Sequence, residues 1–341
     1  MKTILRTFVG CTAILFGTAC MGAVKYVPEN MKVELSLKVP GNNAVNYKLH
    51  PDKLENSYFD YEWRSDNKLP ITVFHKVEER DSCMRLTVQL TAAQDVYFNY
   101  RQLLSTGYRH DNCQFYMPGF WYRRNLRSPK KAPSFHTSDS WLVREDRLSA
   151  PLTGIFSEKE KRFMTVNRLD DFSMDALATH KEGEIILSGK TSLGFTGFEN
   201  QQGIAMLSFG FPYREAPKSY IRKLTLAPEV EAFQLMKKGE SVLLTWEIME
   251  SGADDFSDFI QHTWEHCYDT YAPKPVENSY SIADMKQVLS CFFVNSLVDN
   301  QPLVYNSGIH LKVSDCERNG QAEVGFIGRV LLNAFNAWEY G

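Results

Sequence analysis

The stretch FQLMKKGESVLLTWEI, residues 233–248, decides the fold class of this chain. Its apolar residues occupy alternate positions on both sides of the polar, glycine-containing segment KKGE, residues 237–240. Such alternation is typical of antiparallel strands with one buried face, and the short polar segment is typical of a turn. The stretch therefore predicts a β-hairpin and, with it, a fold based on antiparallel sheet.

The same alternation recurs through most of the chain before residue 254. It is clear at residues 33–37, 71–75, 86–90 and 96–100, and further strands are expected at 163–168, 184–188, 204–209 and 221–226. A small sandwich cannot hold so many strands. The sequence predicts a mainly β fold, a large antiparallel β-sandwich in which two sheets stack face to face.

The alternation fails between residues 111 and 152. This segment combines several prolines with many arginines, lysines and aromatic residues. Long segments without periodicity are usually functional or disordered, and the density of aromatic side chains argues against disorder. We expect an ordered, elaborated loop within a sandwich domain that covers residues 24–275.

Helical patterns follow the sheet region. Apolar residues at helical spacing cover residues 254–271, and Ser281 with Asp284 resembles a capping box that opens a second helix. A last predicted helix, residues 321–340, is apolar around most of its circumference, so it requires cover from other helices. We expect residues 276–341 to form the first helical hairpin of a toroid that this chain leaves incomplete.

The N-terminus predicts export. Residues 1–23 have the layout of a secretory signal, with a short basic start, an apolar stretch and then small residues. Cys20 makes a lipoprotein signal the alternative, and a lipid on Cys20 would be the membrane anchor. We expect a periplasmic or cell-surface protein. Removal of Lys2 and Arg6 lowers the formal net charge from −3 to −5, which gives no general attraction for nucleic acid.

The strongest short motif is HTWEH, residues 262–266, which fits the H-x-x-E-H pattern of inverted zinc proteases. Such enzymes need a further ligand from elsewhere in the chain, and the pattern arises easily by chance. We interpret the motif as the polar flank of a helix and expect neither a metal nor a cofactor. For the cysteines after the signal, a disulfide between Cys291 and Cys316 and buried free thiols are the alternatives.

Aromatic and basic residues gather in two segments, MPGFWYRRN at 117–125 and WLVREDRLS at 141–149. Aromatic rings stack on the apolar faces of sugars, and arginine forks bind carboxylates and sulfates through paired hydrogen bonds. Together they suit an acidic sugar. The candidate substrate-binding residues are therefore Trp121, Arg123, Arg124, Arg144 and Asp146. The alternative is structural, with the tryptophan in the core and the arginines paired inside the loop.

The candidate catalytic residue is Glu323, in the first turn of the last predicted helix. Glycoside cleavage needs two carboxyl groups beside the scissile bond, one with a pKa raised by burial so that it donates a proton. A helix that is itself buried would provide such a site. A glutamate stabilised by the helix dipole is the alternative.

These segments, with CERNGQAEVGFIGRVLLNAFNAWEYG at 316–341, resemble carbohydrate-active enzymes in which an N-terminal β-supersandwich leads into an (α/α) toroid. The chain is similar in character to β-glucuronidases of glycoside hydrolase family 154. The resemblance implies that the long sandwich loop helps to line a sugar site at the mouth of the toroid. It also implies that the loop before Glu323 forms part of the floor of that site.

The function predicted first is the N-terminal part of an exported glycoside hydrolase that acts on uronic-acid-containing glycans and is inactive as this fragment. The first alternative is a non-catalytic glycan-binding or surface-assembly protein whose terminal helix docks on a partner, including a second copy in a homo-oligomer. The second alternative is a polysaccharide lyase in which Tyr122 or His310 takes the proton beside a uronate carboxylate. The expected partner is an acidic oligosaccharide or polysaccharide.

Overall fold

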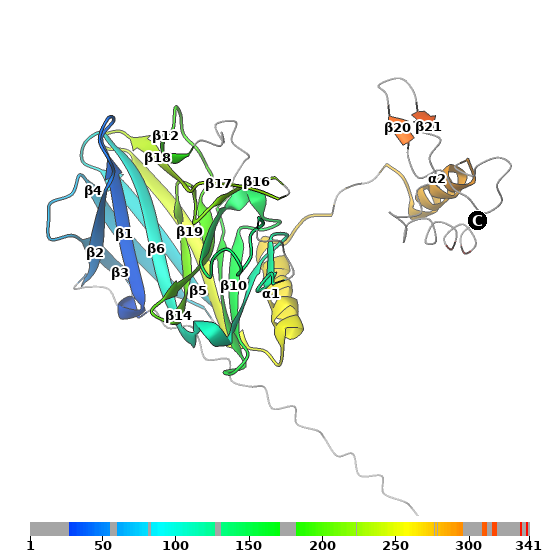
Figure 1. Cartoon of the computed structure of the whole chain (residues 1–341), viewed down its shortest axis with the longest axis horizontal. Coiled ribbons are helices and arrows are strands. Elements are labelled where there is room, and N and C mark those ends of the chain that lie inside the picture. The colour runs from blue at the N-terminus through cyan, green and yellow to red at the C-terminus, as the bar shows by residue number, and fades with distance from the viewer. Residues whose placement is uncertain are drawn as a thin grey trace, which may run out of the picture. The chain divides into compact units, whose positions relative to one another are not determined.

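The computed structural model describes residues 27–54, 60–80, 83–126, 131–170, 182–222, 224–275, 277, 279–295, 309–311, 316–318, 335 and 339. The chain divides into two compact units, Met1–Thr270 and Tyr271–Gly341. The first unit is built mainly from β-strands (Figure 1). Within the described ranges, no helix combines the length and the apolarity needed to cross a membrane.

Seventeen strands of the first unit form one connected sheet that folds into two facing layers (Figure 1). In the first layer the antiparallel neighbours are β9-β13-β14-β6-β1-β2, and β18 pairs with β6 beyond the end of β14. β18 also pairs with β15 and, in parallel, with β12. The bounds are β1 Met31–Lys38, β2 Val45–Lys53, β6 Val96–Arg109, β9 Trp141–Arg144, β12 Gly183–Ile186, β13 Phe195–Gln201, β14 Ile204–Phe211, β15 Arg214–Glu215 and β18 Val230–Met236.

In the second layer the antiparallel neighbours are β2-β3-β4-β5-β19-β11-β10-β7-β8. β2 belongs to both layers, because its residues 45–49 pair with β1 and its residues 50–53 pair with β3. The prediction of a mainly β fold with sandwich character is confirmed. The bounds are β3 Asp60–Arg64, β4 Ile71–Glu79, β5 Cys83–Ala92, β7 Cys113–Met117, β8 Trp121–Arg123, β10 Leu152–Ser157, β11 Arg162–Arg168 and β19 Ser241–Gly252.

The prediction of a hairpin at residues 233–248 is wrong. β18 pairs with β6 in the first layer, whereas β19 pairs with β5 and β11 in the second. The turn at residues 237–240, in which Gly239 has a φ of 83°, therefore carries the chain from one layer to the other. Alternation reports which side chains are buried but not which strand is the partner, so both arrangements satisfy the same pattern.

The segment 111–152 is more regular than predicted. It contains β7, β8 and β9, the 3₁₀ turns η2 (His110–Asn112) and η3 (Glu145–Arg147), and the first residue of β10. These strands have three to five residues, and β7 and β9 are buried along most of their length. Strands so short and so buried show no alternation in the sequence. A small separate hairpin, β16 (Ser219–Arg222) and β17 (Thr225–Ala227), lies further along the chain.

Helix α1 (Phe256–Tyr271) packs on the outer face of the second layer (Figure 1). Phe259 is 0% exposed, and its ring lies 4.9 Å from that of Phe163 and 6.0 Å from that of Phe156. Gly154 on β10 makes room for it, because a Cβ there would come within 2.5 Å of the Phe259 ring. This contact fixes the helix against β10 and β11, close to the predicted bounds of 254–271.

The second unit contains α2 (Ile282–Asn295) and the two-stranded pair β20 (Ile309–Leu311) and β21 (Cys316–Arg318). The capping box is confirmed, because the Ser281 amide donates to the Asp284 carboxylate at 3.0 Å and the Asp284 amide donates to Ser281 Oγ at 3.1 Å. Cys291 is a free thiol, so the disulfide considered above is not formed. The toroid is not confirmed, since the predicted helix 321–340 lies outside the described residues except Phe335 and Glu339.

A polar chain crosses the core between the layers. Nε2 of His75 on β4 lies 2.9 Å from the hydroxyl of Tyr100 on β6, and this hydroxyl donates to Gln102 at 2.8 Å. Because His75 is 0% exposed, desolvation lowers its pKa from 6.5 to about 3. The neutral imidazole therefore links the two layers at ordinary pH.

This burial makes the stability of the sandwich pH-dependent. Between about pH 5.5 and 4, an unfolded chain carries a proton at His75 and a folded chain does not, so acidification favours unfolding. We expect the pH dependence of the unfolding free energy of His75→Gln to be weaker than wild type by about 1.4 kcal/mol per pH unit. Urea unfolding followed by tryptophan fluorescence measures it. His136→Gln, at an exposed histidine, is the matched control. An equal pH dependence of the unfolding free energy in His75→Gln and wild type would contradict the lowered pKa of His75.

Candidate functional site

Trp121 lies in the core between the layers. Its side chain is 0% exposed, and its ring is 5.1 Å from Phe198 and 5.8 Å from Trp141. Its indole Nε1 donates to the backbone oxygen of Arg123 at 2.9 Å. A ring covered in this way has no open face for a sugar, so the position of Trp121 supports the structural alternative.

The two arginines that follow have different partners. The guanidinium of Arg124 donates to the backbone oxygen of Cys113 at 3.2 Å and lies 5.2 Å from the centre of the Phe135 ring. Arg123 is exposed, and its guanidinium lies 4.9 Å from the centre of the Phe256 ring on α1. Of this pair, Arg123 is the one with a solvent-facing charge.

Arg144 and Asp146 bind each other. Nε of Arg144 donates to the Asp146 carboxylate at 2.9 Å, and both side chains are 6% exposed. The residues beside them are paired as well, Glu145 with Arg168 at 2.6 Å and Arg147 with Glu215. These ion pairs fasten η3 to β11 and β15. The positions of Arg144 and Asp146 therefore support a structural role, and the predicted sugar-binding arginines do not converge on one surface.

The candidate catalytic residue, Glu323, lies outside the described residues. The same holds for the predicted signal of residues 1–23 with Cys20 and for most of the predicted last helix. These assignments stay predictions.

A small groove lies on the outer face of the first layer. It has a volume of about 170 Å³, and its lining is Arg101, Ser138, Ser140, Trp141, Leu142, Glu199, Arg214, Ala216, Pro217 and Glu229. This volume is below the roughly 300–1,000 Å³ of pockets that hold drug-sized ligands. The groove therefore suits one small unit of a ligand rather than a whole cofactor.

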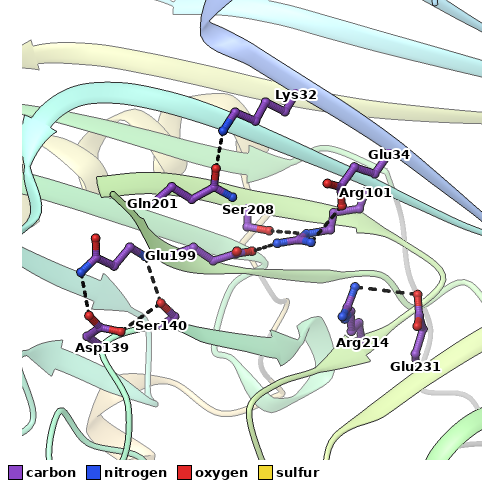
Figure 2. A network of polar contacts seen from close by, with 11 residues as sticks. Lys32, Glu34, Arg101, Asp139, Ser140, Glu199, Gln201, Ser208, Arg214 and Glu231 are labelled. Carbon is purple, nitrogen blue, oxygen red and sulfur yellow. Dashed lines mark hydrogen bonds and ion pairs between the residues drawn. The ribbon is translucent and has the colours of Figure 1, made fainter. Parts of the chain in front are cut away.

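A row of charges forms the floor of the groove (Figure 2). Arg101 on β6 donates to Glu34 on β1 at 3.0 Å and also to Glu199 on β13. The small side chain of Ser208, on the intervening strand β14, accepts a weaker contact from Arg101 at 3.4 Å. The two carboxylates raise the pKa of Arg101 against the opposing effect of burial. The floor thus presents a fixed cation between two fixed anions.

The chain before β9 forms one wall of the groove. The Ser140 hydroxyl donates to Asp139 at 3.2 Å and accepts from the backbone amide of Asn200 at 2.9 Å (Figure 2). Nε1 of Trp141 donates to the backbone oxygen of Ser138 at 3.0 Å, which fixes the buried indole beside the groove. These bonds hold the wall against β13.

Arg214 lies on the other side of the groove (Figure 2). Its Nη1 is 3.8 Å from Glu231, which is too long for a hydrogen bond. Within the described part of the chain, the side chain of Arg214 makes no hydrogen bond. Its guanidinium therefore retains donors for a ligand, and it is the groove residue best placed to bind one.

Sequence reasoning missed this site. Arg101 and Glu199 stand on strands that are far apart in the sequence, and they meet because of the strand order β6-β14-β13. Arg214 comes from β15, which pairs with β18. A weak signal was present, because the charged residues Glu34, Arg101 and Glu199 each follow an apolar or aromatic residue of a strand segment. Without the strand order, that signal indicates only a solvated sheet face.

The HTWEH motif does not have the arrangement of an H-x-x-E-H zinc site. His262 pairs with Asp258 on its own helix at 3.4 Å, whereas Nε2 of His266 lies 2.7 Å from Glu247 on β19. Cys83 on β5 completes a cluster with Glu247 and His266. Burial, together with the nearby Glu247, raises the pKa of Cys83 to about 11. Although burial acts in the opposite direction, the contacts with His266 lower the pKa of Glu247 to about 2.

No family model matches the chain, and no curated protein matches it. Among solved structures it is similar to a polysaccharide lyase, with 12% identity and a TM-score of 0.34 over 69% of this chain and 27% of the lyase. A protein of Synechocystis sp. PCC 6803 is 7% identical, with a TM-score of 0.32 over 63% of this chain and 73% of that protein. A putative kojibiose phosphorylase from the human microbiome is 4% identical, with a TM-score of 0.30 over 75% of this chain and 26% of the phosphorylase.

The chain thus spans about a quarter of the length of the lyase and of the phosphorylase. Similarity at these TM-scores identifies neither an activity nor a substrate for this chain. The resemblance to glycoside hydrolase family 154 stays a prediction.

The groove depends on a close contact at Gly197 on β13. A Cβ at this position would lie 1.9 Å from the backbone oxygen of Trp141 and 2.9 Å from Cα of Leu142. We expect Gly197→Ala to push β9 away and to lower the unfolding free energy by roughly 2–4 kcal/mol, measured by urea unfolding. Gly252→Ala, whose Cβ would meet no atom closer than 3.6 Å, should cost less than about 1 kcal/mol. Equal losses in the two variants would refute the role of this contact.

Proposed function

We propose that the sandwich unit binds a carbohydrate in the groove beside the polar network of Figure 2 and acts as a recognition module. The observation that carries the proposal is the mixture of groups in one small groove: arginine donors at 101 and 214, the carboxylates of Glu199 and Glu229, and serine hydroxyls. Sugar hydroxyls both donate and accept, so they satisfy such a mixture. Leu142 and Pro217 add apolar surface for the C–H face of a ring.

The charges around the groove favour a neutral sugar over an acidic one. Arg101 is already bound by two carboxylates, and Glu229 and Glu231 stand close to Arg214. A uronate carboxylate would meet more anions than cations, which opposes its binding. The uronic acid expected from the arginines of segment 117–149 is therefore the less favoured ligand of this groove.

Binding without cleavage is also the better supported activity. Glycoside cleavage needs a protonated carboxyl group as acid. Glu199 in the groove already accepts a hydrogen bond from Arg101, so this carboxyl group is engaged as an acceptor. Glycoside hydrolysis with Glu323 as a catalytic residue remains the enzymatic version of the proposal. Export by the predicted signal would bring the groove into contact with extracellular glycans.

A comparison of two arginines tests the site. Arg214→Ala removes the available donors of the groove, whereas Arg123→Ala removes an exposed arginine of the predicted loop site. On an array of neutral and uronic-acid-containing oligosaccharides, we expect the wild-type chain to bind neutral members. Titration calorimetry with the best of them should show affinity at least about tenfold weaker for Arg214→Ala and unchanged for Arg123→Ala.

Two outcomes would contradict this assignment. Loss of binding in Arg123→Ala with retention in Arg214→Ala would place recognition at the loop. A wild-type chain that binds no member of the array at millimolar concentration would remove carbohydrate recognition altogether. Circular dichroism checks that both variants are folded.

A further inference from the structure

The structure assigns a second site, independent of the groove: we propose that Cys83, Glu247 and His266 bind one Zn²⁺ ion beneath α1. Their ligand atoms all lie within 4.8 Å of one another. The three residues come from β5, β19 and α1, so separate elements of the fold bring them together. Thiolate, imidazole and carboxylate are the three ligand types that zinc takes in proteins.

The spacing of these atoms is close to that of a zinc site. With zinc bonds of about 2.0–2.3 Å in tetrahedral geometry, ligand atoms stand roughly 3.5 Å apart. The contact of His266 with Glu247 at 2.7 Å would lengthen slightly on binding, and the wider separations would shorten. These shifts are small because Cys83 and Glu247 lie on paired strands, where Cys83 is in register with Met249, two residues from Glu247.

The surroundings provide the second shell of a metal site. Oε1 of Glu247 faces His266 and also accepts from the Thr270 hydroxyl at 3.1 Å. Its other oxygen, Oε2, lies 3.5 Å from the guanidinium of Arg85. Arg85 therefore orients the carboxylate and leaves Oε1 toward the metal, as outer-shell partners do in known sites. Arg85 also balances the charge of the anionic ligands.

Metal binding at these residues has a defined proton balance. The S–H bond of Cys83 breaks, its proton passes to solvent, and a zinc–sulfur bond forms. In the metal-free chain Nε2 of His266 donates its proton to the contact with Glu247. On metal binding this proton leaves Nε2 for solvent while Nδ1 takes one up, so that Nε2 binds through its lone pair. Three protein ligands leave the fourth position of a tetrahedral ion for water, and the His266 side chain is 21% exposed, so solvent reaches this side.

This site differs from the motif that the sequence suggests. In an H-x-x-E-H site both His262 and His266 would bind the metal, but His262 is 43% exposed and pairs with Asp258. The cluster uses His266 alone from α1. An ion here would fasten the last turns of the helix to β5 and β19, so metal binding would stabilise the first unit.

Cobalt(II) provides the test, because tetrahedral Co²⁺ reports its ligands by absorbance. The full chain, reduced and freed of metal, is titrated with Co²⁺ and then with Zn²⁺. We expect one equivalent of Co²⁺ to give a thiolate-to-cobalt charge-transfer band and tetrahedral ligand-field bands, both displaced by Zn²⁺. Cys83→Ser should lose the charge-transfer band, and Glu247→Gln and His266→Asn should weaken binding by at least about 100-fold.

Two matched controls separate the cluster from other ligands. Cys113→Ser removes another buried free thiol, and His262→Asn removes the other histidine of the motif. Both should keep the wild-type spectrum and affinity. A wild-type chain without a charge-transfer band would overturn the proposal, and so would loss of the band in either control. The absence of the band in the wild-type chain overturns the proposal whether or not the ligand variants fold. Failure of sugar binding leaves this test unaffected.

Discussion

The packing of Phe198 between the two layers is the contact on which the groove depends. Its ring stacks on Phe115 of the opposite layer at 4.0 Å and meets Trp121 at 5.1 Å, and its side chain is 0% exposed. Burial of an aromatic side chain is among the largest single contributions to a core. Because residues alternate along a strand, fixing Phe198 inward fixes Gly197 and Glu199 outward. The orientation of β13 therefore sets the outer face.

The two outer faces of the sandwich have different uses. The outer face of the first layer has a hydrogen-bonded charge row, Glu34, Arg101 and Glu199, with Arg214 beside it. Helix α1 packs on part of the outer face of the second layer, and the polar cluster beneath it joins Glu247 to His266. The shared core separates the two, so recognition at the groove and metal binding beneath α1 are independent properties of one scaffold.

The sequence predicted what depends on local pattern. Alternation located several of the longer strands, such as β1, β5 and β19, helical spacing located α1, and Ser281 with Asp284 located the start of α2. The sequence did not predict strand pairing, because pairing depends on residues elsewhere in the chain. Residues 233–248 alternate in the same way whether they form a hairpin or a link between layers, and the structure has the link.

The same limit explains why the residues of the predicted sugar site have structural positions. Trp121, Arg124 and Arg144 have the residue types that bind sugars, but aromatic and arginine side chains also pack and pair inside proteins. The choice between these roles is made by neighbours such as Phe198, Phe135 and Asp146. The sequence also missed the groove residues, because Arg101 and Glu199 are brought together by an intervening strand whose place in the sheet the sequence does not specify.

Fluorine NMR of the chain labelled with 5-fluorotryptophan tests the groove most directly. Trp141 lines the groove, whereas Trp264 lies on the exposed side of α1, 40% exposed. The resonances are assigned by single tryptophan-to-phenylalanine substitutions. On titration with the neutral oligosaccharide that binds best on the array, the Trp141 resonance should shift in a saturable way and that of Trp264 should stay in place. A saturable shift at Trp264 with none at Trp141 would contradict the groove as the recognition site.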